Sequence, residues 1–388
     1  MCSDLLFEPS LTTPEMAEAV SDRAWLKALL SFEAALAQAE SNVGLVSESH
    51  AARIAAACNP DLFDLRLIGR EAIASATPVV PLVDELRRAV GPVTAPDVHR
   101  GATSQDAMDT AMMLVARDGL DLILVGLSAL AATCADLAKR HRSDPMAGRT
   151  LLRRAVPITF GLKSANWMIG ILEARGSLVA LRKNRLAVQL GGPVGTLDAF
   201  AERGFEITVL LAKRLGLAAP EFPWQTTRNR VVELVAGLAI AAGAAAKISY
   251  DLLLLSQDEV AEVAAANPGR SSSMPGKHNL VQAVEARVAF AAVAAQAGML
   301  IGLSPGEHER AAGSWQAEWT AVSQAFRFTA GAVDRTLQAL TGLQVDVAQM
   351  RKNIPTASGE TPDFGASEAL VDRALGIYSR QIDLREGS

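Results

Sequence analysis

The stretch VVELVAGLAIAAGAAAKISYDLLLLSQDEVAEV, residues 231–263, decides the fold because it forms a near-continuous helical pattern of apolar residues. The segment ANPGRSSSMPGKHN, residues 266–279, interrupts this pattern, which then resumes as far as Leu303. Helices this rich in alanine and this poor in charge must be covered on several sides. One chain rarely provides that cover alone, so we predict an all-α bundle of long helices that completes its burial by oligomerising.

Outside this stretch, further breaks divide the chain. Residues 24–43 carry apolar side chains at helical spacing. The segment GPVTAPDVHRGATSQD, residues 91–106, then breaks the periodicity before a long helical run to about residue 141. Asp, Pro and Gly residues interrupt the pattern again after about residue 344. We therefore expect a small helical N-terminal domain, a central helix-bundle domain and a short C-terminal domain, over residues 1–98, 99–343 and 344–388.

Composition limits the function classes. The chain has 388 residues, of which 50% are hydrophobic, so a large core is available. A net charge of -5 and a pI near 5.7, without a basic run, give no reason to expect a nucleic-acid partner. The cysteines Cys2, Cys58 and Cys134 are too scattered for a disulfide framework or a zinc site, which favours a reducing cytoplasm.

We also expect neither export nor membrane insertion. The first residues lack the basic region and the apolar stretch of a signal peptide. Two alanine- and glycine-rich stretches, residues 233–247 and 288–306, have the composition of membrane spans, but the first is too short and the second carries Gln296. We interpret both as buried bundle helices.

The segment SSSMPGKHN, residues 271–279, lies between the two strongest helical patterns. A stretch of small and turn-forming residues is by default a solvated linker. The order of its residues, however, resembles the GSSxMPxKxN signature of the fumarase/aspartase superfamily. The matching positions are Ser271, Ser272, Met274, Pro275, Lys277 and Asn279. The segment departs from that signature at Arg270, where the family usually has glycine.

This resemblance implies roles for three residues of the loop. Ser271 would take a proton from carbon, and Lys277 and Asn279 would hold the substrate carboxylate. Removing a proton beside a carboxylate builds negative charge there, so a fixed ammonium and amide stabilise the transition state. A serine is a poor base, so its alkoxide would need a dry, positively charged pocket made by loop closure. Arg270 either restricts the backbone or adds positive field.

A second segment, HRGATSQDAMDT at residues 99–110, is similar to the first conserved region of the superfamily. It implies that Thr103, Ser104 and Gln105 lie at a helix start, where backbone N–H groups bind a carboxylate. Alternatively, Ser104 only caps the helix. His99 is either a substrate contact or a surface histidine.

A third segment, MAGRTLLRRAVPITFG at residues 146–161, resembles the family pattern GRTHxQxAxPxTxG. The two positions where the family has a histidine are Leu151 and Arg154 here, and Arg153 replaces the glutamine. Neither residue supplies a proton to an amine or hydroxide leaving group, which disfavours ordinary fumarase or aspartase chemistry. Thr150, Arg153 and Arg154 are instead expected to bind an anionic substrate, unless the two arginines form structural ion pairs.

Three further segments resemble the lactonising branch of the superfamily: residues 6–40, 223–239 and 304–319. By this resemblance Arg228 lies in a segment that reaches the substrate. The residues expected near the pocket are His308, Glu309, Arg310 and Trp315, although helical spacing alone would place several of them in a packing helix. Gln189 and Thr196 flank the glycine-rich LGGPVG, and they either contact substrate or form part of a turn without a function.

In that branch, one carboxylate of 3-carboxy-cis,cis-muconate adds reversibly across a double bond, giving the carboxymuconolactone of protocatechuate breakdown. A carboxylate leaving group needs no added proton, because its conjugate acid has a pKa of roughly 4. The resemblance implies a small polycarboxylate substrate and no metal or organic cofactor. It also implies a cytoplasmic homotetramer whose sites combine segments of three subunits, near Thr103, Arg153 and Ser271.

Two alternatives remain open at this point. A lyase on the same scaffold could expel another acidic leaving group, such as nitrite, from a succinate derivative, because that step also needs no general acid. A structural protein could retain the fold without catalysis. The retention of Ser271, Lys277 and Asn279 together counts against the second alternative, because a purely structural loop has no need of that trio.

Overall fold

The chain is described here by a computed structural model that covers residues 6–266, 268–274, 276–355 and 363–386, with side chains as far as residue 381. An N-terminal group of helices comprises α1 (Pro14–Ala19), α2 (Asp22–Asn42), α3 (Glu48–Ala57), α4 (Leu65–Ser75) and α5 (Val79–Val90). The long helices are α6 (Ser104–Arg140), α7 (Phe160–Asn184), α9 (Asn229–Leu255), α10 (Val281–Leu303) and α11 (Ser314–Leu340). The shorter elements are α8 (Gly204–Leu215), α12 (Val347–Lys352), α13 (Ser367–Glu386), β1 (Pro145–Thr150), β2 (Arg153–Thr159), β3 (Val263–Ala264) and β4 (Gln344–Val345).

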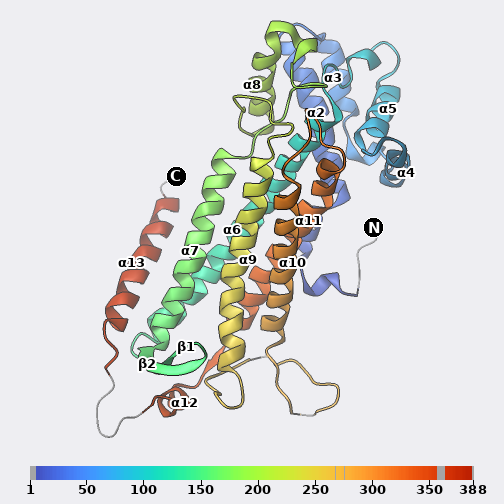
Figure 1. Cartoon of the computed structure of the whole chain (residues 1–388). Coiled ribbons are helices and arrows are strands. Elements are labelled where there is room, and N and C mark those ends of the chain that lie inside the picture. The colour runs from blue at the N-terminus through green and yellow to red at the C-terminus, as the bar shows by residue number, and fades with distance from the viewer. Residues whose placement is uncertain (1–5, 267, 275, 356–362, 387–388) are drawn as a thin grey trace.

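The five long helices run side by side in alternating directions (Figure 1). At one end, which we call the upper end, lie the segments 99–104, 185–203, 216–228 and 304–313 together with α3, α4, α5 and α8. At the other, the lower end, lie the β1–β2 hairpin, residues 256–280 and α12. Helix α6 alone has 37 residues, so the two ends are separated by about 55 Å at 1.5 Å per residue.

Close contact between the long helices depends on small residues. Ala241, Ala242 and Ala245 of α9 are fully buried. At Gly119 of α6, a Cβ atom would lie only 2.7 Å from the ring of Phe326 on α11. Because that ring is itself fully buried, any side chain at Gly119 would force the two helices apart.

The predicted all-α class is confirmed, and helices α2, α6 and α10 lie where the apolar spacing predicts them. One predicted boundary is wrong. The pattern from residue 231 to residue 263 suggests one helix, but α9 ends at Leu255. The chain then turns, with Val260 N–H donating to the Gln257 carbonyl, and Glu262 N–H returns to the Leu255 carbonyl. Apolar spacing does not reveal this turn, because Glu262 enters the interior as an ion-pair partner.

Three helices, α6, α9 and α10, are long and apolar enough to cross a membrane by length and composition alone. In this structure they pack together in the bundle, but only 28% of the most apolar window of α10 is buried. Val284, Val288 and Met299 lie along one exposed side of that helix and are 42 to 49% exposed. A contiguous apolar surface of this kind is typical of a subunit interface.

Val288→Asp is expected to reduce the size of the assembly in solution, because a carboxylate at the centre of an apolar interface loses its hydration without gaining a partner. Light scattering coupled to size-exclusion chromatography measures the change. Ile73→Asp on α4, where the side chain is 84% exposed, serves as the matched control and leaves the assembly intact. A Val288→Asp protein of wild-type size would show that the apolar side of α10 is not an interface.

Candidate active site

A buried carboxylate fixes the start of α6. Thr103 caps the helix, and its N–H donates to Asp106 Oδ2 over 3.0 Å. The same carboxylate accepts the N–H groups of Gly191 and Gly192, both at 2.9 Å, and Nε2 of Gln189 at 3.1 Å. Burial raises the pKa of Asp106 to about 6, although these hydrogen bonds oppose the rise. Asp106 therefore fastens the glycine-rich loop to the helix start.

The glycine-rich loop, residues 191–195, is also tied to the segment before α9. Gln225 Nε2 donates to the Gly192 carbonyl over 2.8 Å, and Gln105 Nε2 donates to the Gln225 carbonyl over 2.6 Å. Gly195 has a φ of +87°, and a Cβ atom there would lie 2.8 Å from Gln225 Oε1. Gln105 is fully buried, and its Oε1 has no hydrogen-bond partner among the described residues, so its predicted substrate contact stays a prediction.

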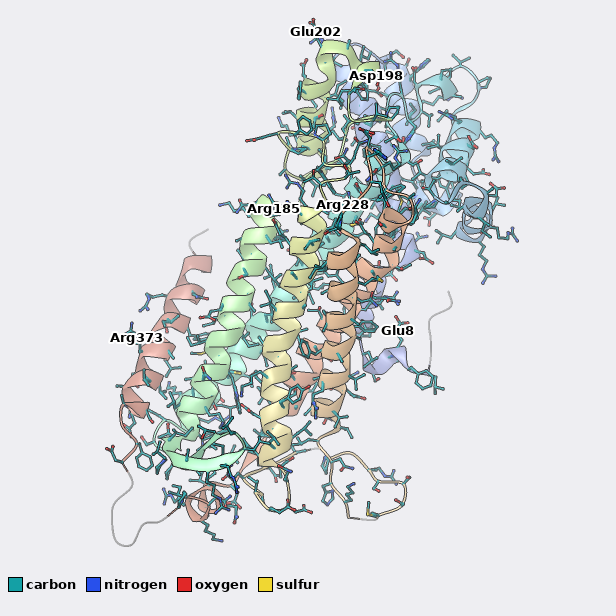
Figure 2. The ribbon with its side chains drawn as sticks, viewed as in Figure 1. Glu8, Arg185, Asp198, Glu202, Arg228 and Arg373 are labelled. Carbon is teal, nitrogen blue, oxygen red and sulfur yellow. The ribbon has the colours of Figure 1, made fainter. Side chains whose placement is uncertain are left out.

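Arg228 lies at the start of α9, within an internal network of charges (Figure 2). The guanidinium donates to both oxygens of Asp109, over 2.7 and 2.9 Å, and pairs with Glu318. Trp315 Nε1 donates to Asp109 over 3.1 Å, and the Trp224 ring lies 5.0 Å from the guanidinium carbon. Arg228 is only 4% exposed, so the structure gives it a joining role between α6, α9 and α11 instead of an open cation for substrate.

Accessible polar groups surround the start of α6. Arg310 Nη2 donates to Thr103 Oγ1 over 2.6 Å and to the Pro193 carbonyl over 3.1 Å. A cation beside the N-terminus of a 37-residue helix favours the binding of an anion. The predicted residues that are exposed or half-buried at this end are Thr103, Ser104, Thr196, His308, Glu309 and Arg310.

His99 is held behind this surface. Its Nδ1 donates to Glu33 Oε1 over 2.7 Å, and the imidazole is 11% exposed, so it is not a surface histidine. Burial alone would lower the pKa of His99, but the Glu33 carboxylate outweighs burial and raises it. Glu40, a fully buried neighbour, has no hydrogen-bond partner for either carboxylate oxygen among the described residues. Burial raises the pKa of Glu40 to about 8.

The signature loop lies at the lower end. Gly269 N–H donates to the Asn279 carbonyl over 2.8 Å, which closes the loop at its base. Within it, Ser271 Oγ accepts the N–H of Met274 over 3.1 Å, and that of Ser273 over a longer 3.4 Å. Lys277 is exposed. Pro275, one of the signature matches, lies outside the described residues.

The base of this loop requires a glycine one position before Arg270. A Cβ atom at Gly269 would lie 2.2 Å from Val281 Cγ1, which no side chain tolerates. Arg270 itself is exposed. Gly269 therefore allows the backbone to approach Val281 closely, and the exposed side chain of Arg270 does not interfere with this contact.

The β1–β2 hairpin carries the third set of predicted residues. Thr150 pairs with Arg153 across the hairpin, and Arg149 pairs with Arg154. Leu151 and Leu152 form the tip with φ values of +48° and +64°, which is the backbone of a two-residue turn that normally uses Asn and Gly. Arg153 and Arg154 are exposed, and neither makes an ion pair within the described part of the chain. The alternative of structural ion pairs finds no support there.

The predicted residues thus form two groups at opposite ends of the bundle (Figure 1). The loop trio and the hairpin lie at the lower end, whereas the α6 start, His99, Arg228 and His308 lie at the upper end. A separation of about 55 Å along α6 prevents a single chain from bringing both groups to one small molecule. The described residues include no group of three or more His, Cys, Asp or Glu side chains placed to hold a metal ion.

Comparison with known proteins agrees with this arrangement of motifs. A family model described as lyase matches residues 8–294. The chain belongs to the fumarase/aspartase superfamily. The 3-carboxy-cis,cis-muconate cycloisomerase of Pseudomonas aeruginosa is 38% identical over 374 residues, which span 95% of this chain and 82% of that protein. The nitrosuccinate lyase of Streptomyces davaonensis is 41% identical over 398 residues, or 96% of this chain and 84% of that protein.

The fold is also similar to that of a solved superfamily structure. The crystal structure of the 3-carboxy-cis,cis-muconate lactonizing enzyme from Pseudomonas putida matches with a TM-score of 0.85 at 35% identity, covering 99% of this chain and 88% of that one. The superfamily resemblance expected from the motifs is therefore confirmed.

Sequence reasoning missed the buried carboxylates that organise the upper end. Asp106 and Asp109 lie in the first two turns of α6, just before the apolar run from Ala111 to Ala116, and both are fully buried. An acidic residue within such a helix must have a partner, because an unpaired buried charge is costly. The sequence shows such acidic residues at Asp106, Asp109 and Glu318, but the spacing of apolar residues does not identify their hydrogen-bond or ion-pair partners.

Glu40→Gln is expected to remove a pH dependence of stability. The pKa of Glu40 rises from 4.5 to about 8 on folding. The stability that this shift contributes to the folded protein is therefore fully present below pH 4.5 and is lost as the pH rises towards 8. The free energy of unfolding of the variant, taken relative to wild type, should therefore be higher at pH 8 than at pH 5 by on the order of 1 to 3 kcal/mol. Urea unfolding at both pH values measures this difference. Glu71→Gln, exposed on α4, is the control, and equal shifts in both variants would contradict the assignment.

Proposed function

We propose that this chain is a 3-carboxy-cis,cis-muconate cycloisomerase, which interconverts that muconate and its carboxymuconolactone. The observation that carries the proposal is the contrast between two segments at the lower end. The loop keeps Ser271, Lys277 and Asn279, whereas the hairpin presents Arg153 and Arg154 and offers no acid. Relatives with this name align over 95% of the chain, which supports the same choice.

One proton-transfer residue is enough for the proposed lactone opening and its reverse. In the direction of lactone opening, Ser271 removes the proton from the carbon beside a carboxylate. The electron pair of that C–H bond forms the C=C bond, and the lactone C–O bond breaks to release a carboxylate. In the reverse direction the carboxylate oxygen attacks, and Ser271 returns the proton to carbon. The departing carboxylate needs no acid, because its conjugate acid has a pKa of roughly 4.

Two features of the chain support serine as the base. Ser271 Oγ already accepts the N–H groups of Ser273 and Met274, and donors of this kind favour a charged oxygen over a neutral one. Lys277 and Arg153 add positive charge to the same end of the molecule. Ser271 is half-buried, so substrate binding has to remove the remaining water before an alkoxide becomes accessible.

The complete site is proposed to form between subunits of a homotetramer. One chain then supplies the loop with Ser271, a second supplies the hairpin with Arg153, and the upper end of a third supplies the α6 start with Thr103. The apolar side of α10 and the distance between the two ends support this assembly. With it we propose the domain division at residues 98 and 343, and a soluble, cytoplasmic protein.

A second candidate function is the elimination of nitrite from a succinate derivative. It is favoured by the 41% identity with nitrosuccinate lyase, and its leaving group is also acidic. Assays on both substrates separate the two. Loss of muconate absorbance in metal-free buffer supports lactonisation, whereas fumarate formed from nitrosuccinate without that loss supports elimination. Turnover of neither substrate would favour the structural alternative.

Ser271→Ala is expected to lower kcat for 3-carboxymuconate by about a thousandfold or more, because it removes the only proposed proton carrier. Ultraviolet absorbance of the muconate follows the reaction. Ser273→Ala is the matched control, since only its backbone contacts Ser271, and it should retain wild-type turnover. If Ser271→Ala turned over at the wild-type rate, serine would not be the proton carrier.

Mixing two inactive variants is expected to restore activity. Ser271→Ala damages the lower end and Arg310→Met damages the upper end, so a mixed assembly contains some sites with both wild-type parts. The two proteins are combined, reversibly dissociated with mild urea, and assayed after reassembly. Each variant treated alone is the control. Recovered turnover supports sites shared between subunits, whereas no recovery in a verified mixed assembly contradicts them.

A further inference from the structure

A buried ion pair at the lower end links two of the proposed functional segments. Arg149 Nη2, from β1, donates to Glu262 Oε1 over 2.6 Å. Glu262 is fully buried and lies between the end of α9 and β3. Asn353, which follows α12, donates from Nδ2 to the same oxygen over 2.9 Å and to the Val260 carbonyl over 2.8 Å. Three separate parts of the chain therefore converge on one carboxylate.

The backbone of Glu262 is fixed on both sides. Its N–H donates to the Leu255 carbonyl over 2.9 Å, and its carbonyl accepts the N–H of Asp346 over the same distance. Val263, the next residue, pairs with Val345 in the β3–β4 ribbon. A carboxylate on so restrained a backbone acts as a fixed point, to which the more exposed hairpin is attached.

Arg149 attaches the hairpin to the Glu262 carboxylate. Arg149 precedes Thr150 and lies directly opposite Arg154, and its Nη1 also donates to the Ala147 carbonyl over 3.1 Å. Residues opposite each other in an antiparallel pair share a face, so Arg149 and Arg154 lie on one face and Thr150 and Arg153 on the other. Any displacement of Arg149 consequently moves the arginines proposed to bind substrate.

The same carboxylate precedes the signature loop in the chain. Ser271 follows Glu262 by nine residues, and the loop begins beyond the short β3 strand. Glu262 Oε2 has no hydrogen-bond partner among the described residues. A buried ion pair with one unpartnered carboxylate oxygen is a poor choice for stability alone, because apolar residues of similar volume in place of the whole pair are often as stable or more so.

We propose that Glu262 is a positioning residue that holds the Arg153–Arg154 hairpin in place against the segment between α9 and β3. The inference rests on the proposed function for its kinetic consequence, but the contact itself is independent of substrate. Glu262 touches no reacting atom and acts through Arg149.

The test compares Glu262→Gln, Arg149→Met and the double variant in the assembled protein. Misplacing a substrate-binding group by about 1 Å costs on the order of a hundredfold in rate, so each single variant should lower kcat roughly ten- to hundredfold. If the residues act through their contact, the double variant should be no slower than the slower single variant. Arg149→Lys, which keeps the cation, should recover part of the loss.

Hydrogen exchange followed by mass spectrometry tests the contact without any substrate. Amides of residues 145–159 should exchange at least about tenfold faster in Glu262→Gln, while those of the long helices remain protected. Asp121→Asn is the matched control, because Asp121 pairs with Arg182 between α6 and α7, away from the hairpin. It should change neither kcat nor exchange in the hairpin.

The outcomes separate the two proposals. If the wild type does not turn over 3-carboxymuconate, the proposed function fails, and hydrogen exchange alone decides the role of Glu262. If wild type is active and Glu262→Gln keeps full kcat, or if hairpin exchange is unchanged, the positioning role is wrong. Additive losses in the double variant would likewise overturn it, because they would show that Glu262 and Arg149 act separately.

Discussion

The rigid length of α6 is the constraint on which the rest of the structure depends. A continuous helix of 37 residues satisfies its backbone hydrogen bonds internally and does not shorten, so it holds the two ends of the molecule about 55 Å apart. Its middle is packed by small and apolar groups, as the approach of Gly119 to Phe326 shows. The accessible polar side chains proposed to act on substrate are therefore displaced to the ends, and two incomplete groups of them result.

Each end is organised by a buried carboxylate, but the two carboxylates are partnered differently. Asp106 is surrounded by neutral N–H donors, and burial raises its pKa to about 6. Glu262 is opposite the cation of Arg149. Hydrogen bonds and ion pairs have direction, whereas apolar contacts have little, so these groups orient loops that the hydrophobic core merely covers. The glycine-rich loop and the arginine hairpin both acquire their positions in this way.

Apolar spacing predicted the long helices well, because their packing against one another follows directly from periodicity. It failed where a charged residue turns the chain inward, as at Glu262, and where a turn uses unusual residues. Leu151 and Leu152 occupy a left-handed turn without Asn or Gly, so no local pattern predicts the hairpin. The motifs identified the functional segments, but only the structure shows that the Arg228 guanidinium is already paired with two carboxylates.

The geometry of one chain explains why the two groups of functional residues lie apart. The apolar side of α10, as the proposed subunit interface, adds a dependence on protein concentration. In the proposed assembly, dissociation leaves Val284, Val288 and Met299 in contact with water, so unfolding and dissociation would be linked equilibria. The apparent stability of the protein would then rise with its total concentration and have no single value. Dilution would also separate the loop of one chain from the helix start of another, so that folding and competence for the proposed reaction would be lost over the same range of concentration.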